Sequence, residues 1–484
     1  MKKNIIKFVV AASMIVIASS CSKSKLNPVS STSLSDASAF QTADRIANQV
    51  NSLYAAAKSG NLYGGRYLIY NDVRGENFLN QTNNVVTAYA IWNFTVTGSD
   101  GEVTGTWDDA YSAINQVNVF LDGMASQGTA VVGDDLSKQY IGEAKFVRAL
   151  MYYTLLQLYA QPYVNGNGSQ PGLPLRLTAI KGSGFNNLAR STVAEIYAQI
   201  ISDLNDAESA VPGDFGDPTL NTTRAHVNTV IALKTRVYLS MSDYANVIAE
   251  ANKIVSATAP FHAPSGVANA LQSNIASVFT NYNTPESIFS APFTGANEAP
   301  GTQNQLGYYY SPTDDPYGGN GEFSLNPTGI IADATWKSTD ARRNFVFTAS
   351  NAKPYLIKYP SGTPYLDWAP IIRYSEVLLN LAEALAKNTN SVDAQAVALL
   401  NAVRNRSDPS TTYSAGSFAS SSDLVNAILR ERDIEFLGEG LRSPDIMRLG
   451  LSFPAKGSVS TIAPSDAAYI FPAPSTEIQY NSLW

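Results

Sequence analysis

Three pairs of adjacent aspartates are the residues of this chain that could do acid–base chemistry: Asp108-Asp109, Asp134-Asp135 and Asp314-Asp315. A glycosidase uses two carboxylates about 5 to 9.5 Å apart, placed on either side of the bond that it cleaves. Neighbouring residues of a helix or a strand point in different directions, so adjacent aspartates do not present that geometry. We therefore interpret the doublets as solvated surface acids, and a glycoside hydrolase stays open as the alternative from the enzyme class.

Patterns for metal or nucleotide chemistry are sparse. The 484 residues include two histidines and one cysteine, with no HExxH motif and no glycine-rich phosphate loop. We therefore expect neither a catalytic metal nor a cofactor. One loop could hold a structural Ca²⁺ through side-chain oxygens. Its candidate ligands are Asp314 and Asp315, followed closely by Asn320 and Glu322.

Aromatic side chains beside hydrogen-bonding residues favour the binding of sugars. A sugar ring has apolar C–H faces and hydroxyl edges, so its site combines a flat aromatic ring with polar side chains at the rim. Trp92-Asn93 stands in a polar stretch without helical periodicity, whereas Trp107 lies on the apolar face of a helical pattern and is assigned to the core. For Trp336 and Trp368, ligand binding and core packing both stay open. The predicted ligand-binding residues are Asp72, Arg74, Trp92, Asn93, Tyr308, Tyr309, Tyr310 and Trp336.

The segment over 428–450 is rich in arginine and acidic residues and contains no lysine. A guanidinium pairs with a carboxylate through two hydrogen bonds in a fixed geometry, which suits partly buried positions. We interpret these residues as a structural network that locks the last helix to its neighbours, and catalysis is the alternative. The residues predicted for this network are Arg373, Glu376, Glu435, Arg442 and Asp445.

The N-terminus has the pattern of an exported lipoprotein. Three lysines at positions 2, 3 and 7 accompany an apolar run over 8–17, which is too short to span a bilayer permanently, and small residues lead to the single cysteine, Cys21. We predict a signal peptide over 1–20 that is removed, a lipid (palmitate) on the Cys21 thiol, and a flexible tether over 21–38. An ordinary signal peptide with an incidental cysteine is the alternative.

The charge balance narrows the class of partner. Once residues 1–20 are removed, 30 basic and 40 acidic residues remain, which argues against nucleic acid as a partner. No second run of about 18 apolar residues exists, so we expect the body to lie outside the bilayer.

Apolar residues spaced by three and four predict the helices that position these side chains. A capping box at Thr192 and Glu195 opens one helix, which ends near Pro212. The stretch 260–369 lacks helical periods and is rich in Tyr, Pro, Gly and Asn, so we expect irregular structure with short strands there. The other predicted helices span 107–121, 140–159, 225–241, 244–256, 371–387, 392–406 and 424–437.

Motifs in a fixed order along the chain resemble the SusD/RagB family. They are WDDAYSAINQVNVFLD at 107–122, GEAKFVRALMYYTLLQLYAQPYV at 142–164, IIRYSEVLLNLAEALA at 371–386, LNAVRNRS at 400–407, ILRERDIEFLGEGLRSPDIMRLG at 428–450 and FPAPSTEIQYN at 471–481. Together with Cys21 they cover nearly the whole mature chain.

The resemblance implies a mostly α-helical lipoprotein with tetratricopeptide-like helix pairs, long irregular loops and a few short strands, forming one domain over 39–484. It also implies non-catalytic capture of oligosaccharides or polysaccharides, or less often of peptides, for a SusC-like TonB-dependent transporter. Such a protein is attached to the outer membrane by its lipid and faces outward.

Overall fold

The computed structural model describes residues 36–484 apart from 183, 185, 296, 297, 299, 300, 302 and 304. The predicted signal peptide, Cys21 and most of the predicted tether lie outside the described residues. The described chain begins with α3 (Asp36–Ala39), so the last residues assigned to the tether are helical, and Phe40 directly after them is buried.

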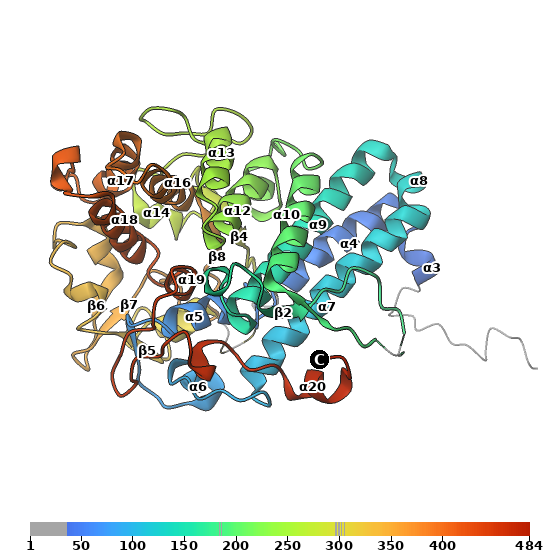
Figure 1. The fold of residues 1–484 in the computed structure, drawn as a ribbon, viewed down its shortest axis with the longest axis horizontal. Coiled ribbons are helices and arrows are strands. Elements are labelled where there is room, and N and C mark those ends of the chain that lie inside the picture. The colour runs from blue at the N-terminus through green and yellow to red at the C-terminus, as the bar shows by residue number, and fades with distance from the viewer. Residues whose placement is uncertain are drawn as a thin grey trace, which may run out of the picture.

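Long helices on one side of the molecule form the first part of the framework. α4 (Ala43–Ala57) and α7 (Gly101–Gly123) pack against α9 (Asp134–Tyr159), and α10 (Val193–Glu208) packs on α9 (Figure 1). The predicted capping box opens α10. α9 begins earlier than predicted, because two aspartates in its first turn favour the positive end of the helix dipole.

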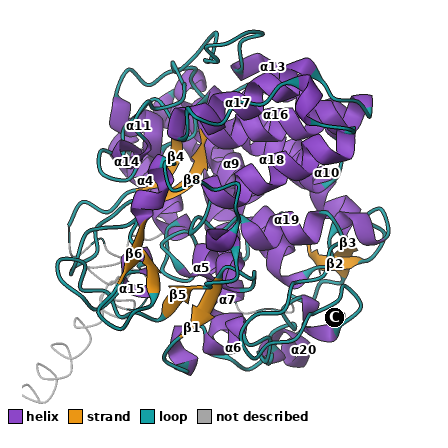
Figure 2. Cartoon of the chain, turned by 90° about the vertical axis from the view of Figure 1, so that its left-hand side faces the viewer, coloured by secondary structure: helices purple, strands orange, loops and turns teal. Residues whose placement is uncertain are grey.

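Two helical hairpins form the second part, as predicted. α12 (Val227–Ser240) turns into α13 (Tyr244–Ile254), and α16 (Tyr374–Thr389) turns into α17 (Ala394–Ser407). α18 (Ser421–Glu435) packs on α16, and Figure 2 shows these helices stacked together. One boundary was wrong, since residues 371–373 were assigned to a helix and belong to a strand that pairs with another part of the chain.

The remaining elements are short, and 260–369 is irregular, as predicted. The described residues form two-stranded antiparallel sheets, which pair β1 (Phe78–Asn80) with β5 (Phe323–Leu325), β2 (Pro171–Pro174) with β3 (Arg190–Thr192), β4 (Ser287–Ala291) with β8 (Ala369–Arg373), and β6 (Val346–Thr348) with β7 (Pro354–Leu356). The short helices are α5 (Arg66–Val73), α6 (Tyr89–Trp92), α8 (Thr129–Val132), α11 (Pro218–Thr223), α14 (Ile275–Val278), α15 (Leu306–Tyr310), α19 (Arg442–Arg448) and α20 (Ser475–Tyr480).

The prediction of a mostly α-helical fold built from helix pairs is confirmed by this arrangement. Trp107 lies in the core, 3% exposed. Across the described part of the chain, no helix is both long enough and apolar enough to cross a membrane.

A buried ion-pair network joins the second hairpin to the irregular region. Arg373 of β8 pairs with Glu435 of α18 at 2.8 Å and with Glu439 at 2.7 Å, and Arg406 of α17 reaches Glu435 at 2.5 Å. The network contains as many cations as carboxylates, so its formal charge is zero, and no side chain in it is more than 4% exposed. Its members are Arg342, Lys358, Arg373, Arg404, Arg406, Glu286, Asp340, Glu431, Glu435 and Glu439.

Two other residues predicted for a structural network also form buried pairs. Glu376 at the start of α16 pairs with Arg236 of α12 at 2.6 Å. Asp445 of α19 pairs with both Arg432 and Arg448 at 2.8 Å. These pairs hold α19 and the second hairpin to the rest of the helical framework.

Candidate functional site

The structure buries the tryptophan that was predicted to stack on a ligand. Trp92 ends α6 and is 5% exposed, and its Nε1–H donates to the carbonyl oxygen of Phe78 at 2.8 Å. The Nζ of Lys456 lies 5.7 Å from the centroid of the Trp92 ring. An indole packed in this way cannot receive a sugar from solvent, so Trp92 is corrected to a core residue. Asn93 beside it is partly exposed.

Asp72 and Arg74 are interior as well, which corrects their predicted role in ligand binding. Asp72 accepts a hydrogen bond from the Gly440 N–H at 2.9 Å. Burial raises the pKa of its carboxyl to about 7, and the Gly440 amide offsets part of that rise. Arg74 places its guanidinium 4.5 Å from the centroid of the Phe453 ring. Both residues attach the end of α5 to the C-terminal part of the chain.

Of the three consecutive tyrosines, only Tyr308 reaches the surface. They lie on α15, where successive side chains point about 100° apart. Tyr309 and Tyr310 therefore turn inward and are fully buried, whereas Tyr308 is half-buried. Trp336 is also corrected to the core, because it is 2% exposed and the Arg343 guanidinium lies 4.1 Å from its ring centroid.

Uncharged polar residues are connected to the segment of Tyr308 by hydrogen bonds, since the Asn320 N–H donates to the Tyr308 carbonyl oxygen at 2.9 Å. We call this surface the amide face and define it by Gln81, Asn83, Asn84, Tyr308 and Asn320, all half-buried or exposed. The buried carboxylate of Glu322 connects its two halves, because it accepts hydrogen bonds from Asn320 Nδ2 and from Thr82 Oγ1. Gln81 adds a further tie, since its Nε2 donates to Ser324 Oγ at 2.8 Å. These hydrogen bonds hold the loop after β1 to β5 and to the segment that carries Asn320.

The loop after β1 supplies the amides of this face, and the sequence analysis overlooked it. Asn80 Oδ1 accepts hydrogen bonds from the backbone N–H groups of Thr82 and Asn83, which turns the chain outward. Asn83 adopts a left-handed conformation with φ 53°, which asparagine tolerates better than most residues. The run of amide residues at 80–84 was the signal that could have found the face.

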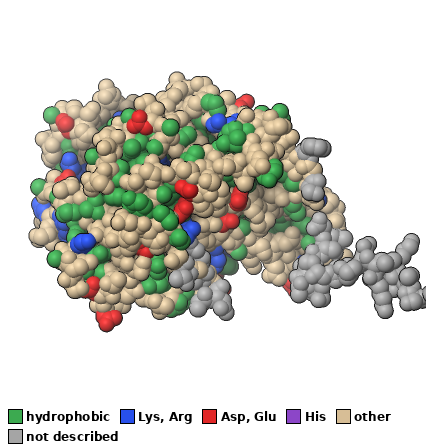
Figure 3. Space-filling model, turned by 90° about the horizontal axis from the view of Figure 1, so that it is seen from below, with side chains coloured by type: hydrophobic (Ala, Val, Ile, Leu, Met, Phe, Trp, Pro, Cys, Tyr) green, Lys and Arg blue, Asp and Glu red, His purple; other side chains and the backbone are tan. Residues whose placement is uncertain are grey.

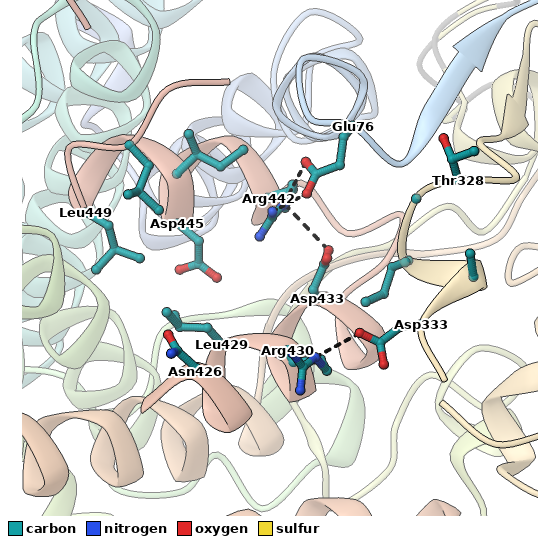
Figure 4. Close-up of a pocket in the computed structure, with 15 residues that line it drawn as sticks. Glu76, Thr328, Asp333, Asn426, Leu429, Arg430, Asp433, Arg442, Asp445 and Leu449 are labelled. Atoms are coloured by element: carbon teal, nitrogen blue, oxygen red, sulfur yellow. Dashed lines mark hydrogen bonds and ion pairs between the residues drawn. The ribbon is translucent and has the colours of Figure 1, made fainter. Parts of the chain in front are cut away.

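A separate hollow of about 570 Å³ opens at the other end of the β1–β5 pair, where Glu76 precedes β1 and Thr328 follows β5. Figure 4 shows Arg442 pointing toward Glu76 and Asp433 across this hollow. The Arg442 Nε donates to Glu76 Oε2 at 3.0 Å. Arg442 was predicted to belong to a structural ion-pair network at partly buried positions, and its side chain, 23% exposed at the wall of the hollow, pairs with Glu76 and Asp433.

The hollow combines charges of both signs with an apolar wall. Arg430 forms an ion pair with Asp333 at 2.8 Å, and Figure 4 shows this pair on the opposite side of the hollow from Arg442. Burial raises the pKa of Asp433 to about 6, although the Arg442 charge lowers it in part. The apolar wall consists of Ile330, Leu429, Ile446, Leu449 and Leu451, and the described lining includes no aromatic ring.

Some of the side chains predicted to hold a structural Ca²⁺ are hydrogen-bonded within the protein. Asp314 Oδ1 accepts a hydrogen bond from the Ser350 N–H at 2.8 Å, and Asn320 donates to Glu322. Asp315 is exposed. Within the described residues, no group of three or more His, Cys, Asp or Glu side chains could hold a metal ion.

Comparisons with known proteins agree on one family. Residues 26–239 match a family model described as "Starch-binding associating with outer membrane", and residues 355–481 match a model described as "SusD family". The SusD-like protein P2 of Formosa agariphila is 24% identical, over 100% of this chain and 98% of its own length.

Solved structures extend the likeness to the fold. A SusD superfamily protein from Bacteroides fragilis is 35% identical with a TM-score of 0.81, and the match covers 92% of this chain and 99% of that chain. A structure described as a laminarin binding SusD-like protein has a TM-score of 0.71 at 20% identity, covering 91% of this chain and 98% of that chain.

Proposed function

Because this chain belongs to the SusD family, we propose that it is a non-catalytic lipoprotein, anchored through Cys21 and facing outward, that binds oligosaccharides and passes them to a SusC-like TonB-dependent transporter. The family binds carbohydrate and is associated with the outer membrane. The model that matches residues 26–239 is described as starch-binding, which supports a binding function in preference to hydrolysis.

We assign the glycan to the amide face. The observation that carries this assignment is the half-buried Tyr308, which lies next to Asn320 and is connected through Asn320 and Glu322 to the loop after β1, so that an aromatic ring and groups that bond hydroxyls occur on linked segments. The side chains that define the face are uncharged, and the exposed Lys353 Nζ donates a hydrogen bond to Gln81 Oε1 at its edge. Figure 3 shows acidic and basic groups scattered among uncharged surface on the underside of the molecule. The uncharged amides favour a neutral glycan, and laminarin is one candidate because a structural relative is described as laminarin binding.

The hollow supports a second candidate, the capture of a peptide. Its guanidinium and carboxylate groups can pair with the opposite charges of a peptide, and its leucine and isoleucine wall can take apolar side chains. Without an aromatic ring in the described lining, it lacks the surface that a sugar face prefers.

Retention in gels that contain laminarin, starch or mannan tests the assignment. The wild type should be retained by at least one polysaccharide, and Tyr308→Ala should lose about thirtyfold in affinity, since loss of a binding hot spot costs at least about 2 kcal/mol. Asn426→Ala is the matched control, because it removes an exposed amide that lines the hollow. If Asn426→Ala lost retention and Tyr308→Ala kept it, the glycan site would have to be assigned to the hollow.

A further inference from the structure

A small pocket lies apart from both the amide face and the hollow, and its described lining shares no residue with either of them. It has a volume of about 190 Å³ and opens between the end of α4, α11 and the β4–β8 pair, which Figure 2 shows close together. We call it the Lys58 pocket and define it by Lys58, Leu220, Arg224, Phe289, Ala291 and Ile371.

The inner wall of the Lys58 pocket is apolar. Phe289 and Ala291 are buried residues of β4, and Ile371 lies on β8, which pairs with β4. Exposed residues, Ala55 and Leu220 among them, also line the pocket, so a ligand can enter it from solvent. An apolar cavity of about 150 Å³ is enough to bind benzene. The Lys58 pocket therefore has room for one aromatic ring and a small polar group.

The polar side of the pocket carries a lysine without an acidic partner. Lys58 directly follows α4 and is half-buried, and its Nζ donates to the Pro292 carbonyl oxygen at 3.0 Å. Among the residues that the structure describes, no carboxylate lies within ion-pair distance of this ammonium group. The buried lysines Lys234 and Lys358 differ in this respect, because both pair with glutamates. A lysine removed from water is normally paired, so Lys58 has a charge that an anionic ligand can meet.

Other charges near the pocket do not neutralise Lys58. Arg224 is the second cation of the described lining, and its Nε and Nη2 both donate to Glu143 at 2.7 Å. That lining includes no acidic side chain. The pKa of Glu298 is lowered chiefly by hydrogen bonds from Thr294 and least by the charge of Lys58, so this carboxylate is not a close partner of the lysine. The pocket thus combines an excess positive charge with an apolar wall.

We propose that the Lys58 pocket binds a small carboxylate that carries an aromatic ring or a branched apolar chain. The carboxylate pairs with Lys58 Nζ, and the apolar body lies against Phe289 and Ile371. A mostly apolar pocket with a few placed polar groups is the usual form of a small-molecule site, and a hydrogen bond between two charged groups orients the ligand in it. The site is independent of the proposed function, because a neutral glycan lacks the charge that Lys58 complements.

Calorimetry with phenylacetate tests the proposal. Phenylacetate should bind with a stoichiometry of one, whereas acetate, which lacks the ring, and phenylacetamide, which lacks the charge, should each bind at least about tenfold more weakly. Lys58→Gln should weaken the binding of phenylacetate about ten- to hundredfold, the loss expected for a hydrogen bond to a charged group. Lys387→Gln is the matched control and should leave the affinity unchanged, because Lys387 is exposed near the end of α16 and does not line the pocket.

A second variant tests the location of the site without removing the charge. Ala55 is exposed and lines the pocket, so Ala55→Phe should occlude it and abolish phenylacetate binding with little change in melting temperature. Both Lys58→Gln and Ala55→Phe should keep the retention by polysaccharide that the wild type shows.

Two results would overturn the proposal: no binding of phenylacetate to the wild type, or equal affinity of the wild type and Lys58→Gln for it. A wild type that binds phenylacetate through Lys58 but is retained by no polysaccharide would support the pocket and contradict only the proposed function.

Discussion

Replacing Glu435 by alanine should lower the free energy of unfolding by about 3 to 5 kcal/mol, the usual result of removing one partner from a buried ion pair. Glu435 is bonded to Arg342, Arg373 and Arg406. Each of these arginines keeps at least one other carboxylate, so the variant leaves one excess buried charge and not three unpaired ones. For this reason the expected loss is that of a single broken pair.

Urea titration at pH 7 measures this loss. Asp206→Ala is the matched control, because Asp206 pairs with Lys145 at the surface with its side chain 55% exposed, and such pairs contribute less than about 1 kcal/mol. Glu435→Gln keeps the shape and removes the charge. A free energy of unfolding for Glu435→Ala within about 1 kcal/mol of the wild-type value would refute the reasoning, since Glu435 would then contribute no more than a surface ion pair does.

The pH dependence of the stability difference between the wild type and Glu435→Gln gives a second check. Burial alone would raise the pKa of Glu435, but Arg406, Arg373 and Arg342 hold it well below its usual range. A carboxyl with a lowered folded pKa stabilises the protein above its unfolded pKa, and this stabilisation is lost as the pH falls through the folded value. The difference in free energy of unfolding between the wild type and Glu435→Gln should therefore be largest at pH 7 and decrease below about pH 4.5.

Asp72 has a pKa raised from 3.8 to about 7 in the folded protein, so its contribution to stability is full below about pH 4 and is lost as the pH rises toward 7. The free energy of unfolding of Asp72→Asn, measured by urea titration, should therefore rise relative to that of the wild type by up to about 4 kcal/mol between these two pH values. Trp92→Ala should lose about 3 to 5 kcal/mol of stability, and a variant with unchanged melting would return Trp92 to the surface. Cys21→Ala should abolish labelling with radioactive palmitate and recovery with membranes, and continued labelling would place the lipid elsewhere.

Helical periodicity in the sequence was enough to predict the framework, because a buried helix face repeats every three to four residues. It failed at Ile371 and Ile372, where apolar residues run on into a helix but pair as a strand with a segment some 80 residues away. Such long-range pairing leaves no local trace. The ion-pair partners of Glu435 could not be identified from the sequence, because they too are distant along the chain. The arginine-rich segment around Glu435 predicted only that it has such partners.

The candidate site was less accessible from the sequence. A tryptophan in a polar stretch has no period that assigns it to a face, so the burial of Trp92 could not be foreseen. Consecutive tyrosines cannot all face outward on a helix, which explains why only Tyr308 does. The amide run at 80–84 was visible, but only the fold connects it through Glu322 and Asn320 to Tyr308.

Titration calorimetry of the wild type against laminarin, starch, mannan and a set of peptides, with analysis of the products, tests the central claim most directly. The account predicts saturable binding of a neutral polysaccharide with no sugar released, and loss of that binding in Tyr308→Ala. Release of sugars by the purified protein, or binding of peptides alone, would contradict it.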